Sequence, residues 1–164
     1  MKDMNVEVLP DDGLKNVIAN YERRRLTSDP VYLAALRELD RRKAKGLDFE
    51  KTKEIVRAAA VQRRFLSYKE VADASGVAWT QVRYEMNRHL GRLVTYAHRH
   101  GWPLLSAIVV NQQHVATGKM EESSLKGFIT IARELGYRVT DEEAFLRDMQ
   151  GKVFDWAASG NHGD

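Results

Sequence analysis

The segment from Phe65 to Asn111 constrains the fold more than any other, because helix and turn signals follow one another closely there. Ser67 and Glu70 form a capping box, in which each side chain satisfies a free backbone N–H at a helix start. Gly76 permits a turn with positive φ. A basic helix is expected from about Ala78 to Leu90, with its apolar side chains turned inward. The order helix, turn, helix is typical of a helix-turn-helix unit.

The residues after this helix complete the pattern of a winged-helix unit. Gly91 predicts a break or bend, after which a further buried helical turn is expected. The run from Leu104 to Val110 has strand composition. The polar segment from Asn111 to Glu122 contains Gly118, and two alternatives stay open for it, a wing or a flexible loop.

Helical extensions are expected on both sides of this unit. Asp11 or Asp12, the Asp29-Pro30 pair and Asp48 mark three N-terminal helix starts. Ser123 or Ser124 and the second capping box at Thr140 to Glu143 mark two C-terminal starts. We expect a mainly α protein with a winged-helix-like unit, a helix-turn-helix plus a short β-strand or wing. The expected parts are an N-terminal helical segment (1–64, its first ten residues extended or disordered), the winged-helix-like unit (65–120), C-terminal helices (121–158) and a disordered tail (159–164).

Composition excludes several classes of function. The 164 residues include no cysteine, which excludes a disulfide framework, a thiolate nucleophile and a zinc site with cysteine ligands. No apolar run is long enough to span a bilayer, and no signal peptide is visible, so a cytoplasmic protein is expected. No glycine-rich phosphate loop or nucleotide fingerprint occurs, and no cofactor is predicted.

Charge is distributed unevenly along the chain. Residues 1–120 carry 21 Lys and Arg against 14 Asp and Glu, whereas residues 121–164 carry 5 against 9. A basic front part favours a polyanionic partner, although such drift also occurs in proteins without one. The runs Arg23-Arg24-Arg25 and Arg41-Arg42-Lys43-Ala44-Lys45 fit either flanking phosphate contacts or solvated helix ends.

The outward positions of the expected basic helix carry side chains that suit DNA. Arginine reads guanine and asparagine reads adenine at base edges, while lysine and arginine also hold phosphates. The alternative for these positions is an ordinary solvated helix face. The predicted DNA-binding residues are Tyr68, Lys69, Thr80, Gln81, Arg83, Tyr84, Asn87, Arg88 and Arg92.

The segment from Tyr68 to Val110 resembles the DNA-binding half of the O6-alkylguanine DNA alkyltransferases and the alkyltransferase-like proteins. Its start, SYKEVA at residues 67–72, is similar to the family's TYGELA, and QVR at residues 81–83 is similar to its AAR. The resemblance implies that Arg83 lies where the family inserts an arginine into the DNA stack. It also implies that Tyr68 contacts the DNA backbone near a flipped nucleotide.

The family's third motif, PCHRVV, differs here. Aligning Ile108-Val109-Val110 with its end puts Ser106 at the reactive cysteine and Ala107 at the activating histidine. Alkyl transfer needs a thiolate, and a serine beside an alanine has no base. The resemblance therefore implies a winged-helix scaffold that contacts DNA, without a lesion pocket or catalysis.

Histidines and paired carboxylates are candidates for two other chemistries, metal binding and acid–base catalysis. His98 and His100 are two residues apart and point to different sides of a helix, and Asn111 to His114 is too short a spacing for a ββα-metal nuclease, so no metal site is predicted. The carboxylates at Glu121-Glu122 and at 141–143 lie at helix starts, where acidic groups stabilise the helix without chemistry.

The sequence thus predicts a non-enzymatic protein that binds double-stranded DNA, such as a bacterial or phage regulator or an accessory factor in genome defence or mobile-element biology. The alternative is a protein-interaction module or inhibitor that binds a partner, or a second copy of itself as a homodimer, through the helical extensions. A third hypothesis is that the protein is an enzyme that acts on DNA. No membrane association is expected.

Overall fold

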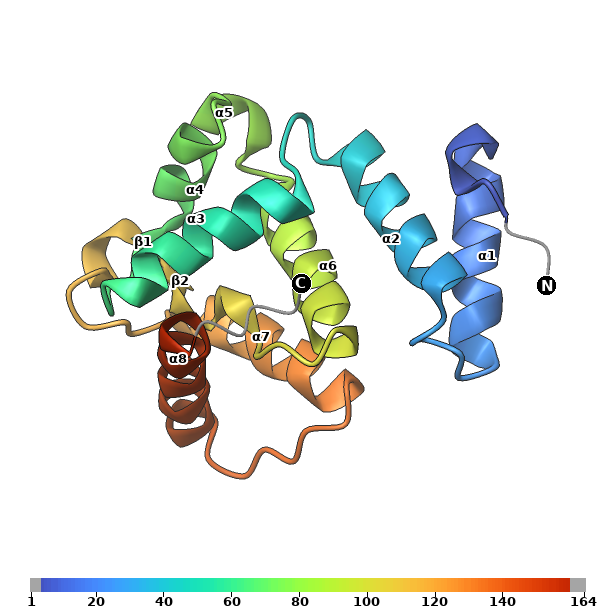
Figure 1. Cartoon of the computed structure of the whole chain (residues 1–164). Coiled ribbons are helices and arrows are strands. Elements are labelled where there is room, and N and C mark those ends of the chain that lie inside the picture. Colours follow the sequence, from blue (N-terminus) through green and yellow to red (C-terminus); the bar gives the residue numbers. More distant parts are fainter. Residues whose placement is uncertain (1–3, 160–164) are drawn as a thin grey trace.

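A computed structural model of the chain describes residues 4–159, and this part is mainly α-helical (Figure 1). The few extended residues form a single pair of two-residue strands. In chain order the elements are η1 (Val6–Val8), α1 (Asp11–Arg23), α2 (Pro30–Lys43), α3 (Phe49–Val61), β1 (Leu66–Ser67), α4 (Tyr68–Ala74), α5 (Trp79–Val82), α6 (Met86–Arg99), η2 (Leu105–Ile108), β2 (Val109–Val110), η3 (Gln112–His114), α7 (Glu122–Glu134) and α8 (Glu142–Ala158).

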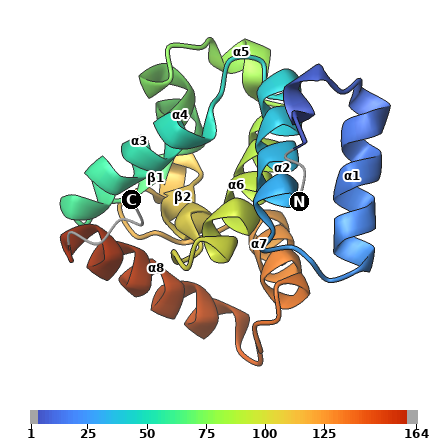
Figure 2. The ribbon, with the colours of Figure 1, turned by 45° about the vertical axis from the view of Figure 1, so that its right-hand side comes forward.

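Helices α1 and α2 form a hairpin at one side of the molecule, with α1 outermost and α2 next to α6 (Figure 2). The hairpin has a small core of its own, in which Val6, Leu14 and Ala35 are buried. The main core lies among α3, α6, α7 and α8 and surrounds η2. The expectation that residues 1–10 are extended or disordered is wrong for η1, because Val6 packs into the hairpin core; residues 1–3 lie outside the described part.

Local capping chemistry explains most of the helix starts. The Asp29 carboxylate accepts from Val31 N (2.8 Å), and the Asp48 carboxylate accepts from Lys51 N (3.1 Å). The capping box at Ser67 and Glu70 is complete, with hydrogen bonds of 3.0 and 3.2 Å. These three predicted starts are confirmed, because a cap depends only on residues that are neighbours in the sequence.

The cap predictions at the other helices need correction. No side chain caps α1 or α7, and Asp11 instead lies inside α1 and pairs with cations of α2. At α8 the capping residue is Asp141, which accepts from Ala144 N (3.0 Å), rather than Thr140.

The expected helix from Ala78 to Leu90 is interrupted. Helix α5 ends at Val82, residues 83–85 form a turn, and α6 then runs without a break from Met86 to Arg99. Gly91 does not bend α6: a Cβ there would lie 3.1 Å from the Ile131 side chain, so this glycine lets α7 approach closely. Gly76 adopts the expected positive φ of 75° in the turn between α4 and α5.

The strand expected from Leu104 to Val110 is mostly the 3₁₀ helix η2. Within this run the strand is β2 (Val109–Val110), which pairs with β1 in parallel, with Leu66 opposite Val109. Nearly all side chains of the run are buried, and an apolar run without alternation does not distinguish a strand from a buried helical turn.

The segment after β2 forms the compact η3 turn and a loop. Gly118 in this loop is covered by the Phe65 ring, and the Gln150 amide of α8 donates to the carbonyls of Ala107 and Gly118 (3.0 and 2.8 Å). These contacts fold the loop against the core, so residues 111–121 hold no strand pair. Across residues 4–159, no helix has both the length and the apolar surface needed to cross a membrane.

Candidate nucleic-acid interface

The predicted contact residues of α5 and the start of α6 lie on the surface. Val82 and Met86 are buried beneath them, and this inward anchoring turns the polar side chains outward. Two of the side chains come from α5, two from the turn and two from the first turn of α6. The exposed set, which we call the α5–α6 face, is Thr80, Gln81, Arg83, Tyr84, Asn87 and Arg88.

The turn between the two helices presents the most accessible part of this face. The Tyr84 side chain is 75% exposed, and the Arg83 guanidinium lies 4.6 Å from its ring centroid. Within the described part of the chain no carboxylate pairs with Arg83. A cation held only by an aromatic ring remains available for an anionic partner, because the pair keeps its full positive charge.

Arg88 and Asn87 project from the first turn of α6. Arg88 forms an ion pair with Glu85 (3.0 Å), three residues earlier in the chain, and its side chain is two-thirds exposed. The Glu85 side chain is only 16% exposed, so Arg88 contacts an anion at least cost if it keeps this pair and uses its exposed side.

The remaining predicted residues differ in exposure and in whether an ion pair holds their charge. Lys69 is exposed and pairs with Asp73 (2.8 Å) along α4. Tyr68 is largely covered, and burial raises the pKa of its hydroxyl. The Arg92 guanidinium is mostly covered and bound to the buried Asp40 (2.9 Å), so a phosphate contact by Arg92 would have to share or open that pair.

A cavity of about 440 Å³ opens beside the α5–α6 face. Asn87 and Arg88 lie at its polar side, together with Tyr68 and Ser106. The rest of the lining is mainly apolar or small: Leu90, Gly91, Val109, Met120, Ser123, Ser124, Gly127, Phe128 and Ile131. The volume falls within the range of about 300–1,000 Å³ that is usual for small-ligand sites.

The cavity was not predicted from the sequence. Helix α7 supplies one of its walls, and α7 lies outside the segment from Tyr68 to Val110 that resembles the alkyltransferases. Ser123, Ser124 and Gly127 recur at helical spacing, so the α7 wall has little side-chain volume. Ser106 is small on the opposite side. Tyr68 and Ser106, which the resemblance places near a flipped nucleotide and at the reactive position, line one cavity.

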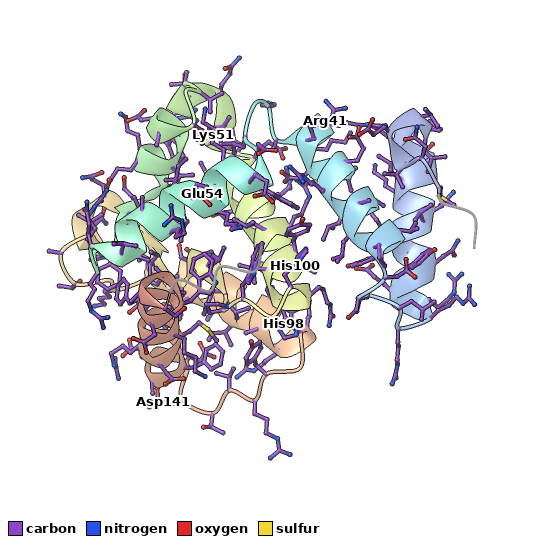
Figure 3. All side chains as sticks on the ribbon, viewed as in Figure 1. Arg41, Lys51, Glu54, His98, His100 and Asp141 are labelled. Carbon is purple, nitrogen blue, oxygen red and sulfur yellow. The ribbon has the colours of Figure 1, made fainter. Side chains whose placement is uncertain are left out.

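Two further cations lie next to the α4–α5 turn. The Lys51 ammonium donates to the Ser75 carbonyl (3.2 Å), and Figure 3 shows Lys51 on α3 beside α4. The loop between α2 and α3 packs on Val77, since a Cβ on Gly46 would lie only 2.7 Å from it. Lys45 in that loop is exposed.

The two basic runs of the sequence have different environments. Arg41, Arg42 and Lys43 are all bound to carboxylates inside the α1–α2 hairpin, so most of that run is structural. Hydrogen bonds from Arg41 and Arg42 lower the pKa of Glu38 to about 2. Arg24 and Arg25 at the end of α1 are exposed.

A buried polar network links α2, α3 and α6. His89 Nδ1 lies 2.8 Å from the Asp40 carboxylate, and His89 Nε2 lies 2.8 Å from the Thr52 hydroxyl. This order of groups is similar to that of a catalytic triad. All three side chains are at most 1% exposed, so no substrate reaches them, and the network acts as a link between helices.

His98 and His100 have structural surroundings. His98 Nδ1 lies 3.3 Å from the Tyr137 hydroxyl, and the His100 ring stacks on Trp102. Burial lowers the pKa of both histidines. In residues 4–159 no three His, Cys, Asp or Glu side chains are grouped so that they could hold a metal ion.

The candidate interface thus comprises the α5–α6 face, the cavity beside it, and Lys45, Lys51 and Lys69 around α4. Comparisons of the chain with protein-family models, with curated proteins and with solved structures find no match.

Proposed function

We propose that this protein binds double-stranded DNA through the α5–α6 face, without catalysing a reaction. The observation that carries the proposal is the exposure of Arg83 and Arg88 on a helical edge with buried anchors beneath it. Elsewhere in the chain a comparable group of cations, Arg41 to Lys43, is neutralised by carboxylates. Cations that the fold leaves with weak or no partners are the ones that a phosphate backbone can engage.

On this proposal residues 65–120 are a winged-helix-like unit in which a compact loop takes the place of a β wing. Helix α4 and the Gly76 turn carry the phosphate contacts, because the first helix of such a unit crosses the DNA backbone. Lys69 lies on α4 and Lys51 beside the turn, which agrees with that role. Asn87 and Arg88 are then placed to reach base edges in a groove.

The cavity beside the face would receive a base rotated out of the duplex. The volume of the cavity and its mainly apolar lining support this step, although the resemblance alone implies no lesion pocket. Covalent transfer is not proposed, because the lining described above supplies no histidine, carboxylate or lysine to remove the Ser106 proton. An everted base would be held by stacking and hydrogen bonds alone.

Titration of a short duplex with the protein at several salt concentrations tests the proposal. We expect binding that weakens steeply as salt rises, and Arg83→Ala/Arg88→Ala should weaken it about tenfold or more while lowering the slope by about two. The matched control, Arg138→Ala/Lys152→Ala, removes the same charge from exposed positions in the C-terminal part and should change affinity less than about threefold.

No duplex binding at micromolar protein and low salt would contradict the proposal and favour the partner-protein alternative. Equal losses in both double variants would also contradict it, because net charge rather than this face would then control binding.

A further inference from the structure

Tyr84 is exposed to an extent that packing does not explain. Its side chain is 75% exposed, and it lies in the turn at residues 83–85 rather than inside a helix. The described contact of its ring is with the Arg83 guanidinium at 4.6 Å. An aromatic ring that keeps most of its surface free can stack on a planar ligand, so the exposure of Tyr84 among polar residues suits nucleic acid.

The ring is also held in a defined place. Val82 and Met86, two residues to either side, are buried and fix both ends of the turn. The Arg83 guanidinium lies against the ring, and Thr80 and Asn87 are exposed before and after it in the chain. Tyr84 is thus an exposed aromatic group on a turn that is anchored at both ends, within a run of exposed polar residues that suit nucleic acid.

An aromatic ring at such a place recognises the flat face of a nucleobase. Stacking of a base on an aromatic side chain contributes about 1–3 kcal/mol. In an intact duplex both faces of each base are covered by neighbouring bases, and opening a step costs a few kcal/mol. The cost is smallest where a base is mismatched or missing, so stacking by Tyr84 selects such sites.

We propose that Tyr84, backed by Arg83, stacks on a base face exposed where the duplex is interrupted, so that the protein prefers DNA with a mismatched or missing base over intact duplex. This inference rests on the proposed function, and it names the kind of DNA that the same face selects.

The test compares three duplexes of one length and sequence: intact, with one central mismatch, and with one central abasic site. Fluorescence anisotropy at fixed salt measures the affinity of the full chain for each. We expect the wild type to bind the interrupted duplexes about tenfold or more tightly than the intact one. Tyr84→Ala should remove this preference, because the stacking surface is lost, whereas Tyr84→Phe, which keeps the ring, should retain it.

Two controls separate stacking from other effects. Val61→Ala truncates another exposed apolar side chain, 54% exposed on α3, and should leave all three affinities unchanged. A 2-aminopurine base beside the abasic site should be quenched by the wild type and by Tyr84→Phe but not by Tyr84→Ala.

Equal wild-type affinity for the three duplexes overturns the inference while leaving DNA binding intact. A preference that survives in Tyr84→Ala also overturns it, because another group would then make the selection. Failure to bind any of the three duplexes overturns both this inference and the proposed function.

Discussion

The α1–α2 hairpin and the α5–α6 face both carry clustered cations, but the two clusters differ in how strongly carboxylates pair with them. In the hairpin, Arg42 contacts the carboxylates of Glu38 (2.6 Å) and Asp11 (3.1 Å). On the α5–α6 face, no carboxylate within residues 4–159 pairs with Arg83, and Arg88, two-thirds exposed, has a single pair with the mostly covered Glu85 in the same range. A basic run in a sequence therefore does not by itself identify a polyanion site. A structural run is paired with carboxylates of the same fold, whereas a run that can bind a polyanion is not.

The same contrast occurs within α6 itself. His89 on its inner side is fully buried and joined to Asp40 and Thr52, whereas Asn87 and Arg88, the two residues before it, are exposed. One side of the helix thus fixes the hairpin to the core, and the other side remains free. The predictions below separate these two roles.

Breaking the buried network should have the largest effect. Asp40→Ala leaves His89 and Arg92 without their carboxylate, and removal of one partner of a buried pair costs about 3–5 kcal/mol. Urea unfolding measures this loss. Asp73→Ala, which removes an exposed carboxylate from α4, is the control and should cost about 0.5 kcal/mol or less. Similar losses in the two variants would contradict the structural role of the network.

A pair of double variants tests the contrast directly. Arg83→Ala/Arg88→Ala should lose about tenfold or more in duplex affinity and should lower the unfolding midpoint less than the hairpin variant, because it breaks one ion pair. Arg41→Ala/Arg42→Ala should lower the midpoint, because Glu38 loses both partners, and keep duplex affinity within about threefold. Both variants remove two charges, so the same outcome in both would erase the distinction drawn here.

Acidification should destabilise the α1–α2 hairpin, because protonation of Glu38 removes its negative charge. The pKa of this carboxyl in the folded protein is lowered from 4.5 to about 2 by hydrogen bonds from Arg41 and Arg42. A lowered folded-state pKa stabilises the fold above about pH 4.5, and this contribution is lost as the pH falls toward 2. Glu38→Gln should cost about 1–2 kcal/mol at pH 7, and its difference from wild type should shrink on acidification. A difference independent of pH would show that the ion pairs do not stabilise the hairpin.

Substitution of Lys45 should have the smallest effect on duplex affinity. Lys45 is exposed in the loop that packs on Val77, so under the proposed function it touches phosphate at the edge of the interface. Lys45→Ala should weaken duplex binding about twofold to fivefold and reduce the salt slope by about one. An unchanged slope would place this loop outside the interface.

Features determined by sequence neighbours were predictable. The caps at Asp29, Asp48 and Ser67, the positive φ of Gly76 and the inward positions of Val82 and Met86 were all predicted correctly. Each depends on hydrogen bonds or periodicity within a few residues.

Features determined by distant parts of the chain were not predictable from the sequence. The 3₁₀ turn at Leu105 to Ile108 depends partly on Gln150, and the continuity of α6 at Gly91 depends on close packing with Ile131. The cavity needed the small side chains of α7, and the bonding of Arg92 needed Asp40 from α2. Long-range partners of this kind leave no local pattern in a sequence.

Backbone hydrogen exchange with and without a saturating duplex locates the interface without any substitution. If the α5–α6 face binds DNA, exchange should slow in residues 79–88 and in the turn at Gly76, with little change in α1. Unchanged exchange in residues 79–88 while DNA is bound, with protection confined to α1 or α8, would contradict binding through this face.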